Sequence, residues 1–483
     1  MNVFDYFFKD TKHLEKDFVI GNQETISYQD LYMNSLKVAS FLKKKVGTDQ
    51  NIILIKQNSV FFITVYLGIM KSGNVCIPLD FSIEKENFSF IKDLSESKTV
   101  FLDKKLVLKL DLGDFDLTID DDIFEKLIKN HSVGNFGYNF DRQQTAQIIF
   151  TSGSTGKPKG VMLSHQNLIS NTDSIIDYLK LTPKDIQLIV LPFYYCFGLS
   201  LLHTHLKVGG QIVLNNAFMF LGTVINDLKK YRCTGFSGVP SHYQMLLKKS
   251  KSFKENDFPD LRYVTQAGGK LHNVFIKEFI DNFPAVDFVV MYGQTEATAR
   301  LSYLPPDLVL KKLGSIGKGI PGVELKVVDH EGHEVAKDEV GEIVAKGGNI
   351  MKGYYKDSKG TNIAIKNEWL YTGDLAKIDK DGYITIVARE KEIIKVGGKR
   401  VSPKEIEEVI LSVQNVVDCT IKGIFDEVQG EALKAVIVIN HFEEREKIKN
   451  QILIQCKKKL ILYKVPRVFE FKRVMKVKSS GKK

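Results

Sequence analysis

Cysteine is scarce in this chain, and no two cysteines have the close spacing of a zinc site or a redox motif. The five residues, at positions 76, 196, 233, 419 and 456, are widely separated along 483 residues. A disulfide framework and a structural zinc site are therefore both disfavoured. This use of cysteine is typical of a reducing compartment, so we expect a cytoplasmic protein.

Long apolar stretches are also missing. The longest run, at about 60–70, is well short of the ~20 residues that span a bilayer, and it predicts a buried helix instead. The first ten residues, MNVFDYFFKD, lack the basic region and apolar core of a signal peptide. We expect neither a transmembrane segment nor a secretory leader.

Acidic residues are few at the C-terminal end. The formal net charge is +10, and residues 442–483 hold 14 Lys or Arg against 4 Glu, so the remainder of the chain is balanced. Such a basic segment would suit an acidic carrier protein or an anionic membrane surface, and it would equally suit a solvated face that draws in phosphates. Because aromatic residues are not interleaved as in RNA-binding segments, no nucleic-acid partner is expected.

The length of the chain predicts two or more domains, because one hydrophobic core rarely serves 483 residues. Apolar runs such as 51–55, 187–193 and 211–215 alternate with amphipathic stretches, which indicates βαβ units and parallel sheets. Shorter strands with frequent turn signals follow at about 314–386 and favour a small β-barrel or distorted sheet. A further mixed unit, with helical patterns at 402–413 and 443–460, begins after residue 388.

The most informative segment is AQIIFTSGSTGKPKG, residues 146–160. A β-rich run leads into a loop whose glycines, hydroxyls and backbone N–H groups can converge on a polyphosphate, with lysines as countercharges. It is not a Walker A sequence, because Thr151 and Pro158 stand where that motif requires Gly and Ser or Thr. The residues expected to hold phosphate are Thr151, Ser152, Gly153, Ser154, Thr155, Gly156, Lys157 and Lys159.

Together with VMLSHQNL, which follows it, this loop resembles the phosphate-loop signature of the adenylate-forming superfamily, which includes acyl-CoA synthetases, luciferases and the adenylation domains of peptide synthetases. Four further segments resemble motifs of that family in their usual order. The resemblance implies an α/β fold with a large N-terminal domain over 1–388, made of two doubly wound sheets and a small β-barrel. A small mobile α+β lid over 389–483 would follow.

The same resemblance implies a nucleotide site. In MYGQTEAT (291–298), Tyr292 would face adenine, Thr295 would touch the α-phosphate and Glu296 would reach Mg²⁺, a hard ion that prefers carboxylate oxygens. In YTGDLA (371–376), Asp374 would accept hydrogen bonds from the ribose hydroxyls. The resemblance adds Gly268, Gly269, Gly293 and Arg389 to the residues around AMP.

Residues 384–410 resemble the hinge and the pantetheine tunnel of the family. Lys391 would be the pivot, Gly397 and Gly398 would let the thiol arm pass, and Arg400 would contact phosphate or CoA. Ala388 stands where the family commonly has Gly. The following SPKEIEEVI predicts a capped helix, with Ser402 as N-cap, Pro403 in the first turn and Glu405 completing the capping box.

The last ten residues, VMKVKSSGKK, resemble the element that carries the catalytic lysine, which by alignment is Lys482. Its ammonium would bridge the substrate carboxylate and the α-phosphate. The usual Pro and Thr of this element are missing, and Lys478 is a weaker substitute.

LPFYYCFGLS (191–200) resembles the aromatic gate, so Tyr195 and Phe197 would border the acyl carboxylate. No acidic residue follows the gate to pair with an α-amine, which favours a small-molecule carboxylic acid without that amine, of the fatty or aryl kind. His203 and His205 are interpreted as packed or surface histidines rather than a metal pair, because no further ligand stands at suitable spacing.

The implied activity is ATP- and Mg²⁺-dependent formation of an acyl adenylate, followed by transfer of the acyl group to the thiol of CoA or of a carrier protein's phosphopantetheine. The alternatives are an enzyme dedicated to loading a carrier protein, one that stops at the adenylate or passes it to an amine or an oxygen, and a degenerate, non-catalytic protein that binds AMP or an acyl adenylate.

Overall fold

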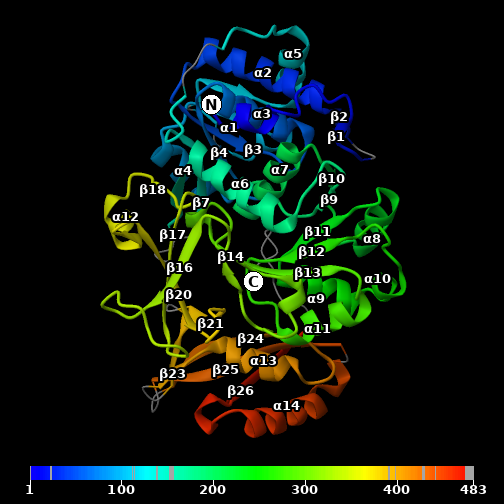
Figure 1. Cartoon of the computed structure of the whole chain (residues 1–483), viewed down its shortest axis with the longest axis vertical. Helices are drawn as coiled ribbons and strands as arrows, with labels where there is room; N and C mark the ends of the chain where they lie inside the picture. The colour runs from blue at the N-terminus through cyan, green and yellow to red at the C-terminus, as the bar shows by residue number, and fades with distance from the viewer. Residues whose placement is uncertain are drawn as a thin grey trace.

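The computed structural model describes residues 2–21, 24–110, 112–113, 115–136, 140–151, 157–389, 392–396, 399–426, 430–440 and 442–473. It contains four sheets, three in the larger N-terminal part and one at the C-terminal end (Figure 1). The expected α/β architecture is confirmed. In the part of the chain just given, no helix combines the length and the apolar character needed to cross a membrane.

One sheet has seven strands in the order β18-β8-β7-β4-β3-β5-β6. Its five strands β3 to β7 are mutually parallel, as the apolar runs predict, whereas β8 and β18 are antiparallel additions at one edge. The strands are β3 (Asn51–Ile55), β4 (Val75–Pro78), β5 (Thr99–Leu102), β6 (Leu117–Ile119), β7 (Thr145–Thr151), β8 (Lys159–Ser164) and β18 (Gly353–Tyr354).

The second sheet has nine strands in the order β15-β14-β13-β12-β11-β9-β10-β1-β2. Six of them form a parallel core, and β2, β14 and β15 extend its two ends by antiparallel pairing. The strands are β1 (Asp17–Val19), β2 (Ile26–Ser27), β9 (Ile186–Ile189), β10 (Gln211–Leu214), β11 (Gly235–Gly238), β12 (Tyr263–Gln266), β13 (Asp287–Tyr292), β14 (Ser302–Leu304) and β15 (Lys318–Gly319).

Helices pack against these sheets because each carries an apolar face. The predicted buried helix is α3, whose residues from 61 to 71 are all buried. Helix α6 begins with a capping box between Ser164 and Asn167, which satisfies two backbone donors of its first turn. The helices are α1 (Val3–Phe8), α2 (Tyr28–Lys45), α3 (Val60–Lys71), α4 (Lys85–Ser95), α5 (Asp121–Asn130), α6 (His165–Leu179), α7 (Cys196–Val208), α8 (Leu221–Lys230), α9 (Pro240–Lys249), α10 (Lys251–Glu255), α11 (Asn273–Asn282) and α12 (Ser358–Ala364).

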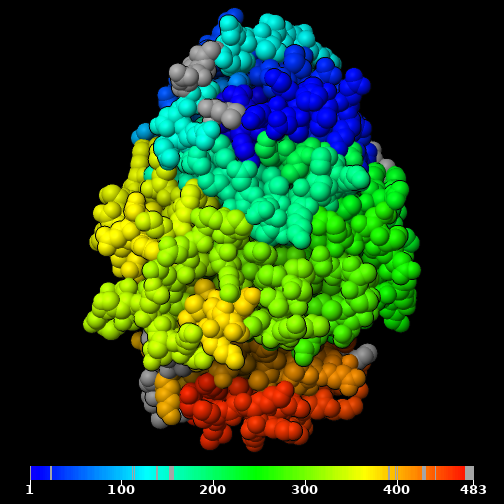
Figure 2. Space-filling model, in the orientation of Figure 1, coloured from blue at the N-terminus to red at the C-terminus, as the bar shows by residue number. Residues whose placement is uncertain are grey.

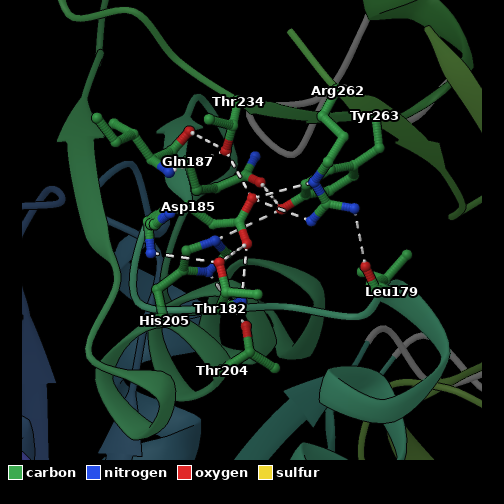
Figure 3. Close-up of polar contacts among 11 residues, drawn as sticks. Leu179, Thr182, Asp185, Gln187, Thr204, His205, Thr234, Arg262 and Tyr263 are labelled. Atoms are coloured by element: carbon green, nitrogen blue, oxygen red, sulfur yellow. Dashed lines mark hydrogen bonds and ion pairs between the residues drawn. The ribbon is translucent and has the colours of Figure 1, made fainter. Parts of the chain in front are cut away.

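A polar network holds the second sheet together at the ends where its parallel strands begin (Figure 3). Asp185, just before β9, accepts hydrogen bonds from Thr182, Thr234 and both Nε and Nη2 of Arg262. Burial opposes ionisation of Asp185, but these hydrogen bonds outweigh it and lower its pKa. The network lies at the opposite ends of the strands from those where ligands usually bind in such sheets, so its role is structural.

The third sheet corresponds to the barrel-like region expected at about 314–386. Its five strands are all antiparallel, with β16 pairing to β17, β17 to β20, and both β19 and β21 to β20. The strands are β16 (Val323–Val328), β17 (Gly341–Gly347), β19 (Ile365–Lys366), β20 (Trp369–Ile378) and β21 (Ile384–Arg389).

The C-terminal unit is a small α+β body that lies along one end of the molecule, orange to red in Figure 2. Its β24 contacts α9, and Lys270 of the large part forms a 2.8 Å ion pair with Glu408 of α13. Its elements are β22 (Ile394–Val396), β23 (Lys399–Val401), α13 (Pro403–Leu411), β24 (Val416–Asp426), β25 (Gly430–Ile439), α14 (Arg445–Lys459) and β26 (Val468–Lys472).

The predicted capping box of α13 is wrong. Ser402 occupies the N-cap position and Pro403 the first turn, as expected, but Ser402 makes no side-chain cap. Its Oγ donates instead to the carbonyl of Val387 in β21, at 2.7 Å, and Glu405 pairs with Lys464. The hydroxyl of Ser402 is used as a donor to a tertiary carbonyl instead of as an acceptor for the first turn, and the bond ties the start of α13 to the third sheet.

Candidate active site

A cavity of about 50 Å³ lies where the parallel strands of the second sheet end, next to the start of α7. The carboxyl ends of such strands are the usual place for ligands, since the loops that follow them meet there. Tyr195 and Phe197, the predicted gate, both line it, and so does Thr295. The complete lining is Leu191, Pro192, Tyr195, Cys196, Phe197, Val239, Ala267, Gly268, Gly293, Gln294, Thr295, Ala299 and Arg300.

Two glycines let the backbone approach this cavity. A Cβ on Gly293 would lie 2.0 Å from the carbonyl oxygen of Ala299, which no side chain could accept. Gly268 has φ +82°, a left-handed conformation that favours glycine. Gly269, beside it, would meet only ordinary contacts, although its carbonyl accepts a 2.7 Å bond from Gln266.

The predicted phosphate loop connects the two strands of an antiparallel hairpin. Thr151 at the end of β7 pairs with Lys159 at the start of β8. A Walker A loop leads from a strand into a helix, so this connection separates the two classes in structure as well as in sequence. Lys157 is exposed, whereas residues 152–156 lie outside the described part of the chain.

Residues 351–357 connect this hairpin to the turn that carries Glu296 through hydrogen bonds. The N–H of Met351 donates to the Glu296 carbonyl at 2.9 Å, and the N–H of Tyr355 donates to Gly160 at 2.7 Å. The hydroxyl of Tyr354 donates to Oε1 of Glu296 at 2.9 Å. The predicted magnesium ligand is thus held in place by a side chain from β18.

Lys159 has a partner in the same segment. Its Nζ lies 3.0 Å from a carboxylate oxygen of Asp357 and 4.6 Å from the centre of the Tyr354 ring. A backbone N–H from Gly360 and the Lys159 ammonium lower the pKa of Asp357. Lys159 therefore lies where the loop joins β8, and the carboxylate of Asp357 offsets part of its positive charge.

The predicted adenine and ribose residues lie together. The hydroxyl of Tyr292 donates to Oδ2 of Asp374 at 2.7 Å, and Nε of Arg389 donates to Oδ1 at 2.8 Å. Burial raises the pKa of Tyr292 well above its usual value, and Asp374 adds to this effect. Burial would lower the pKa of Arg389, but the Asp374 carboxylate outweighs it and raises that pKa. Asp374 is only 3% exposed. Burial and these two hydrogen bonds fix the orientation of its carboxylate, and so they fix the direction from which it can accept a further hydrogen bond.

Several predicted residues lie outside the described residues. These are Ser152, Gly153, Ser154, Thr155, Gly156, Lys391, Gly397, Gly398, Lys478 and Lys482. For Arg400 the backbone is described, and it pairs with Lys395 in the β22–β23 ladder.

His203 and His205 are packed, as interpreted from the sequence. Nε2 of His203 lies 2.8 Å from the hydroxyl of Tyr66, and its ring stacks on those of Phe7 and Tyr66. Burial lowers the pKa of His203 to about 3 and that of His205 to about 4. Both imidazoles are therefore neutral at physiological pH.

Sequence reasoning missed three residues of the site. Tyr354 and Asp357 stand in no motif, and their partners Glu296 and Lys159 are far away in the chain, so only the pairing of β18 with β8 brings them together. Arg300 lies just beyond MYGQTEAT and lines the cavity while fully buried. A cation soon after an apolar strand and the turn of a family motif was the available signal for it.

The hairpin loop, the Tyr292–Asp374–Arg389 group and the cavity at the strand ends define the class of adenylate-forming enzymes. Family models agree: the AMP-binding enzyme model matches residues 8–355, and the AMP-binding enzyme C-terminal domain model matches residues 405–482. The chain belongs to the AMP-binding enzyme family.

Individual proteins show the same likeness. The chain is similar to the oxalate–CoA ligase of Arabidopsis thaliana, with 30% identity over 428 residues, 85% of this chain and 82% of the relative. ATP-bound MatB from Rhodopseudomonas palustris matches with a TM-score of 0.88 and 26% identity, over 100% of this chain and 97% of that one. An anthranilate CoA ligase in complex with anthranoyl-AMP shares the fold, with a TM-score of 0.93 at 23% identity, over 100% and 95% of the two chains.

Proposed function

We propose that the protein is an AMP-forming acid–thiol ligase that converts a small carboxylic acid first to an acyl adenylate and then to a thioester. The observation that carries this proposal is the joint position of Tyr292, Asp374 and Arg389 for a nucleoside, with Thr295 on the wall of the adjoining cavity. Membership of the family and the CoA ligases among its relatives support the same activity.

The adenylation half-reaction begins when a carboxylate oxygen of the acid attacks the α-phosphorus of ATP. A new phosphorus–oxygen bond forms, the bond to the bridging oxygen of the β-phosphate breaks, and pyrophosphate leaves. Thr295 would hydrogen-bond the α-phosphate, and Lys482 is the proposed ammonium that offsets the charge growing between the reacting groups. The hairpin loop with Thr151, Lys157 and Lys159 would hold the β- and γ-phosphates.

Glu296 fits a magnesium role. Its Oε1 accepts from Tyr354, and this bond orients the carboxylate, which leaves Oε2 as a hard oxygen donor of the kind that Mg²⁺ prefers. When bound, the ion would neutralise phosphate charge.

The thioester half-reaction needs a thiol at the carbonyl carbon of the adenylate. The sulfur forms a bond to that carbon, the bond from carbon to the phosphate oxygen breaks, AMP leaves and the thiol proton passes to solvent. Gly397, Gly398 and Arg400 are proposed to admit the thiol arm after the lid turns about Lys391. CoA is the acceptor that the relatives favour, and an acidic carrier protein is the second candidate because residues 442–483 are strongly basic.

The substrate is not fixed by the relatives, since one is an oxalate–CoA ligase and another an anthranilate CoA ligase. The test is therefore pyrophosphate release over a panel of carboxylic acids, with CoA or a holo carrier protein then supplied and the product weighed by mass spectrometry. Acid-dependent pyrophosphate release followed by a thioester is the expected result. Binding of AMP without pyrophosphate release for any acid would identify a non-catalytic binding protein instead.

The lid assignment has its own test. Lys391→Pro should leave adenylation intact and abolish thioester formation, because a fixed φ at the pivot blocks the rotation. Equal loss of both half-reactions, or of neither, would contradict the assignment.

A further inference from the structure

Arg300 is among the largest fully buried side chains of the protein, with 2% of its surface exposed. It follows β13 and the turn of Thr295, and it lines the same cavity as Thr295 and Phe197. The central carbon of its guanidinium lies beside the ring of Phe197, which also lines the cavity, so the charged head is next to the proposed acid-binding pocket.

Among the described residues, this guanidinium contacts neutral groups. Its Nε donates to the sulfur of Met291 at 3.2 Å, Nη1 to the carbonyl of Ala299 at 3.3 Å and Nη2 to the hydroxyl of Ser200 at 3.4 Å. Its central carbon lies 4.0 Å from the centre of the Phe197 ring. These three hydrogen bonds are long, and Tyr178 is a fourth hydrogen-bond partner of the guanidinium.

The charge of Arg300 has no carboxylate partner among the described residues. Burial lowers its pKa, but a guanidinium remains protonated at neutral pH. The neighbouring Tyr178 does not supply an anion, because burial raises its pKa to about 12. A buried charge without a counter-charge is unfavourable, and proteins ordinarily pair such groups.

Two other cations with little exposed side chain follow that rule. Lys56 pairs with both Asp103 and Asp121, and Lys71 pairs with Asp5. The stacking of Arg300 on Phe197 stabilises the cation but brings no negative charge. Arg300, which lines the pocket, differs from both lysines in this respect.

We infer that the missing anion arrives with the substrate: Arg300 binds a second carboxylate, so the protein activates short dicarboxylic acids. This inference rests on the proposed function, which places the reacting carboxylate beside Thr295. Thr295 and Arg300 line one cavity, so a single small molecule can reach both. The cavity is small, about 50 Å³, which favours a short acid over a long one.

The bidentate geometry of a guanidinium suits a carboxylate better than it suits a hydroxyl or an amide. Phe197 would then have two roles, since it borders the acid and fixes the plane of the guanidinium. A long apolar acyl chain would have to pass a buried cation and leave it unpaired, which disfavours fatty acids.

The test compares acids of equal length by pyrophosphate–ATP exchange: malonate with propanoate, succinate with butanoate, and glutarate with pentanoate. Succinamate, with a neutral amide in place of the second carboxylate, separates charge from shape. The wild-type protein should favour the dicarboxylate of at least one pair by about 100-fold in kcat/KM, with the amide well below it, as expected for loss of a charge-assisted hydrogen bond in a buried site.

Substitutions of Arg300 test whether this residue causes the preference for the dicarboxylate. Arg300→Met should lower the ratio of kcat/KM between the favoured dicarboxylate and its monocarboxylate partner by about 100-fold, and Arg300→Lys should retain part of the preference. Arg232→Met is the matched control, because it removes an arginine paired with Asp260 on the exposed surface and should leave the ratio unchanged. Thermal unfolding checks that each variant folds. If Arg300→Met does not fold, the dicarboxylate-to-monocarboxylate ratio of kcat/KM in the wild-type protein decides whether the protein prefers dicarboxylic acids.

The possible results distinguish failure of the dicarboxylate assignment from failure of the proposed function. Exchange that is faster with the monocarboxylate of every pair, or a ratio that Arg300→Met leaves unchanged, would overturn the dicarboxylate assignment and leave the acid-activating function standing. Exchange with no acid at all would overturn the proposed function itself.

Discussion

Tyr292 and Asp374, which are 82 positions apart in the chain, are joined by a 2.7 Å hydrogen bond from the phenol to the carboxylate. The bond holds Asp374 in one orientation, with Arg389 on its other oxygen. Each carboxylate oxygen can accept a further hydrogen bond, so the ribose hydroxyls can still be recognised. This relationship couples the residue expected at adenine to the one expected at ribose.

Tyr292→Phe should raise the KM for ATP by about 5- to 10-fold, because it removes one hydrogen bond worth roughly 1 kcal/mol and loosens Asp374. Asp374→Asn should raise it by about 10- to 100-fold, since the charge-assisted contacts are lost. Initial rates of pyrophosphate exchange at varied ATP give both values. The matched control is Tyr231→Phe, because the buried hydroxyl of Tyr231 has no hydrogen-bond partner within the described chain. Equal effects of the two Phe variants would contradict the assignment.

Lys159 is expected to exchange its contact with Asp357 for phosphate when ATP binds. Lys159→Met should then lower kcat/KM for ATP by about 10-fold or more, whereas Asp357→Asn should change it by no more than about 2-fold. The salt dependence of the KM for ATP should weaken in Lys159→Met only. If both variants lose activity equally, the ion pair serves the local structure rather than the nucleotide.

Lys270 and Glu408 form an ion pair between the nucleotide side of the large domain and α13 of the C-terminal unit, at 2.8 Å. Lys270 directly follows Gly269, so the docking contact begins at the loop beside the cavity. Breaking the pair should change the ratio of the two half-reaction rates by about 3- to 10-fold, in the same direction for Lys270→Met and Glu408→Gln. Single-turnover measurement of adenylate and thioester formation gives the ratio.

The control for this pair is Lys312→Met, which breaks ion pairs with Asp379 and Asp381 within the large domain and should leave the ratio unchanged. A lid contact that mattered only for stability would slow both half-reactions together. That outcome would contradict a role in domain rotation.

Asp185→Asn should lower the free energy of unfolding of the large domain by about 2–3 kcal/mol at pH 7, because Arg262 and two threonines lose a buried anionic acceptor. The pKa of Asp185 is lowered by folding, so its contribution is present above the unfolded pKa of about 3.9 and is lost as pH falls through the folded value. Urea unfolding of both proteins at several pH values should show the difference shrinking only below about pH 4. A difference that is constant with pH would contradict this account.

Local patterns in the sequence predicted strands and helices, whereas the roles that the motifs assign to site residues stay predictions. The run at 51–55 is strand β3, and the apolar stretch at 60–70 is the buried helix α3. These predictions are confirmed because burial of apolar side chains at a regular spacing determines both elements.

Tertiary contacts account for the features that local sequence patterns did not predict. The capping box at Ser402 was wrong because its hydroxyl is oriented by a bond that it donates to the carbonyl of Val387, fifteen positions earlier, and it does not accept from the first turn. The roles of Tyr354 and Asp357 depend on an antiparallel pair between β18 and β8, strands almost two hundred residues apart. The burial of Arg300 depends on how α7 packs over the end of β13, and no local pattern encodes that packing.

The central claim, that the acid is activated by transfer to AMP, is tested most directly with an acid whose carboxylate carries oxygen-18. Attack on the α-phosphorus makes a carboxylate oxygen the bridge of the adenylate, and thiol attack at carbon then leaves that oxygen on the phosphate. Mass spectrometry should find one oxygen-18 in each AMP released during turnover. AMP that carries only oxygen-16, while thioester accumulates, would contradict the acyl adenylate.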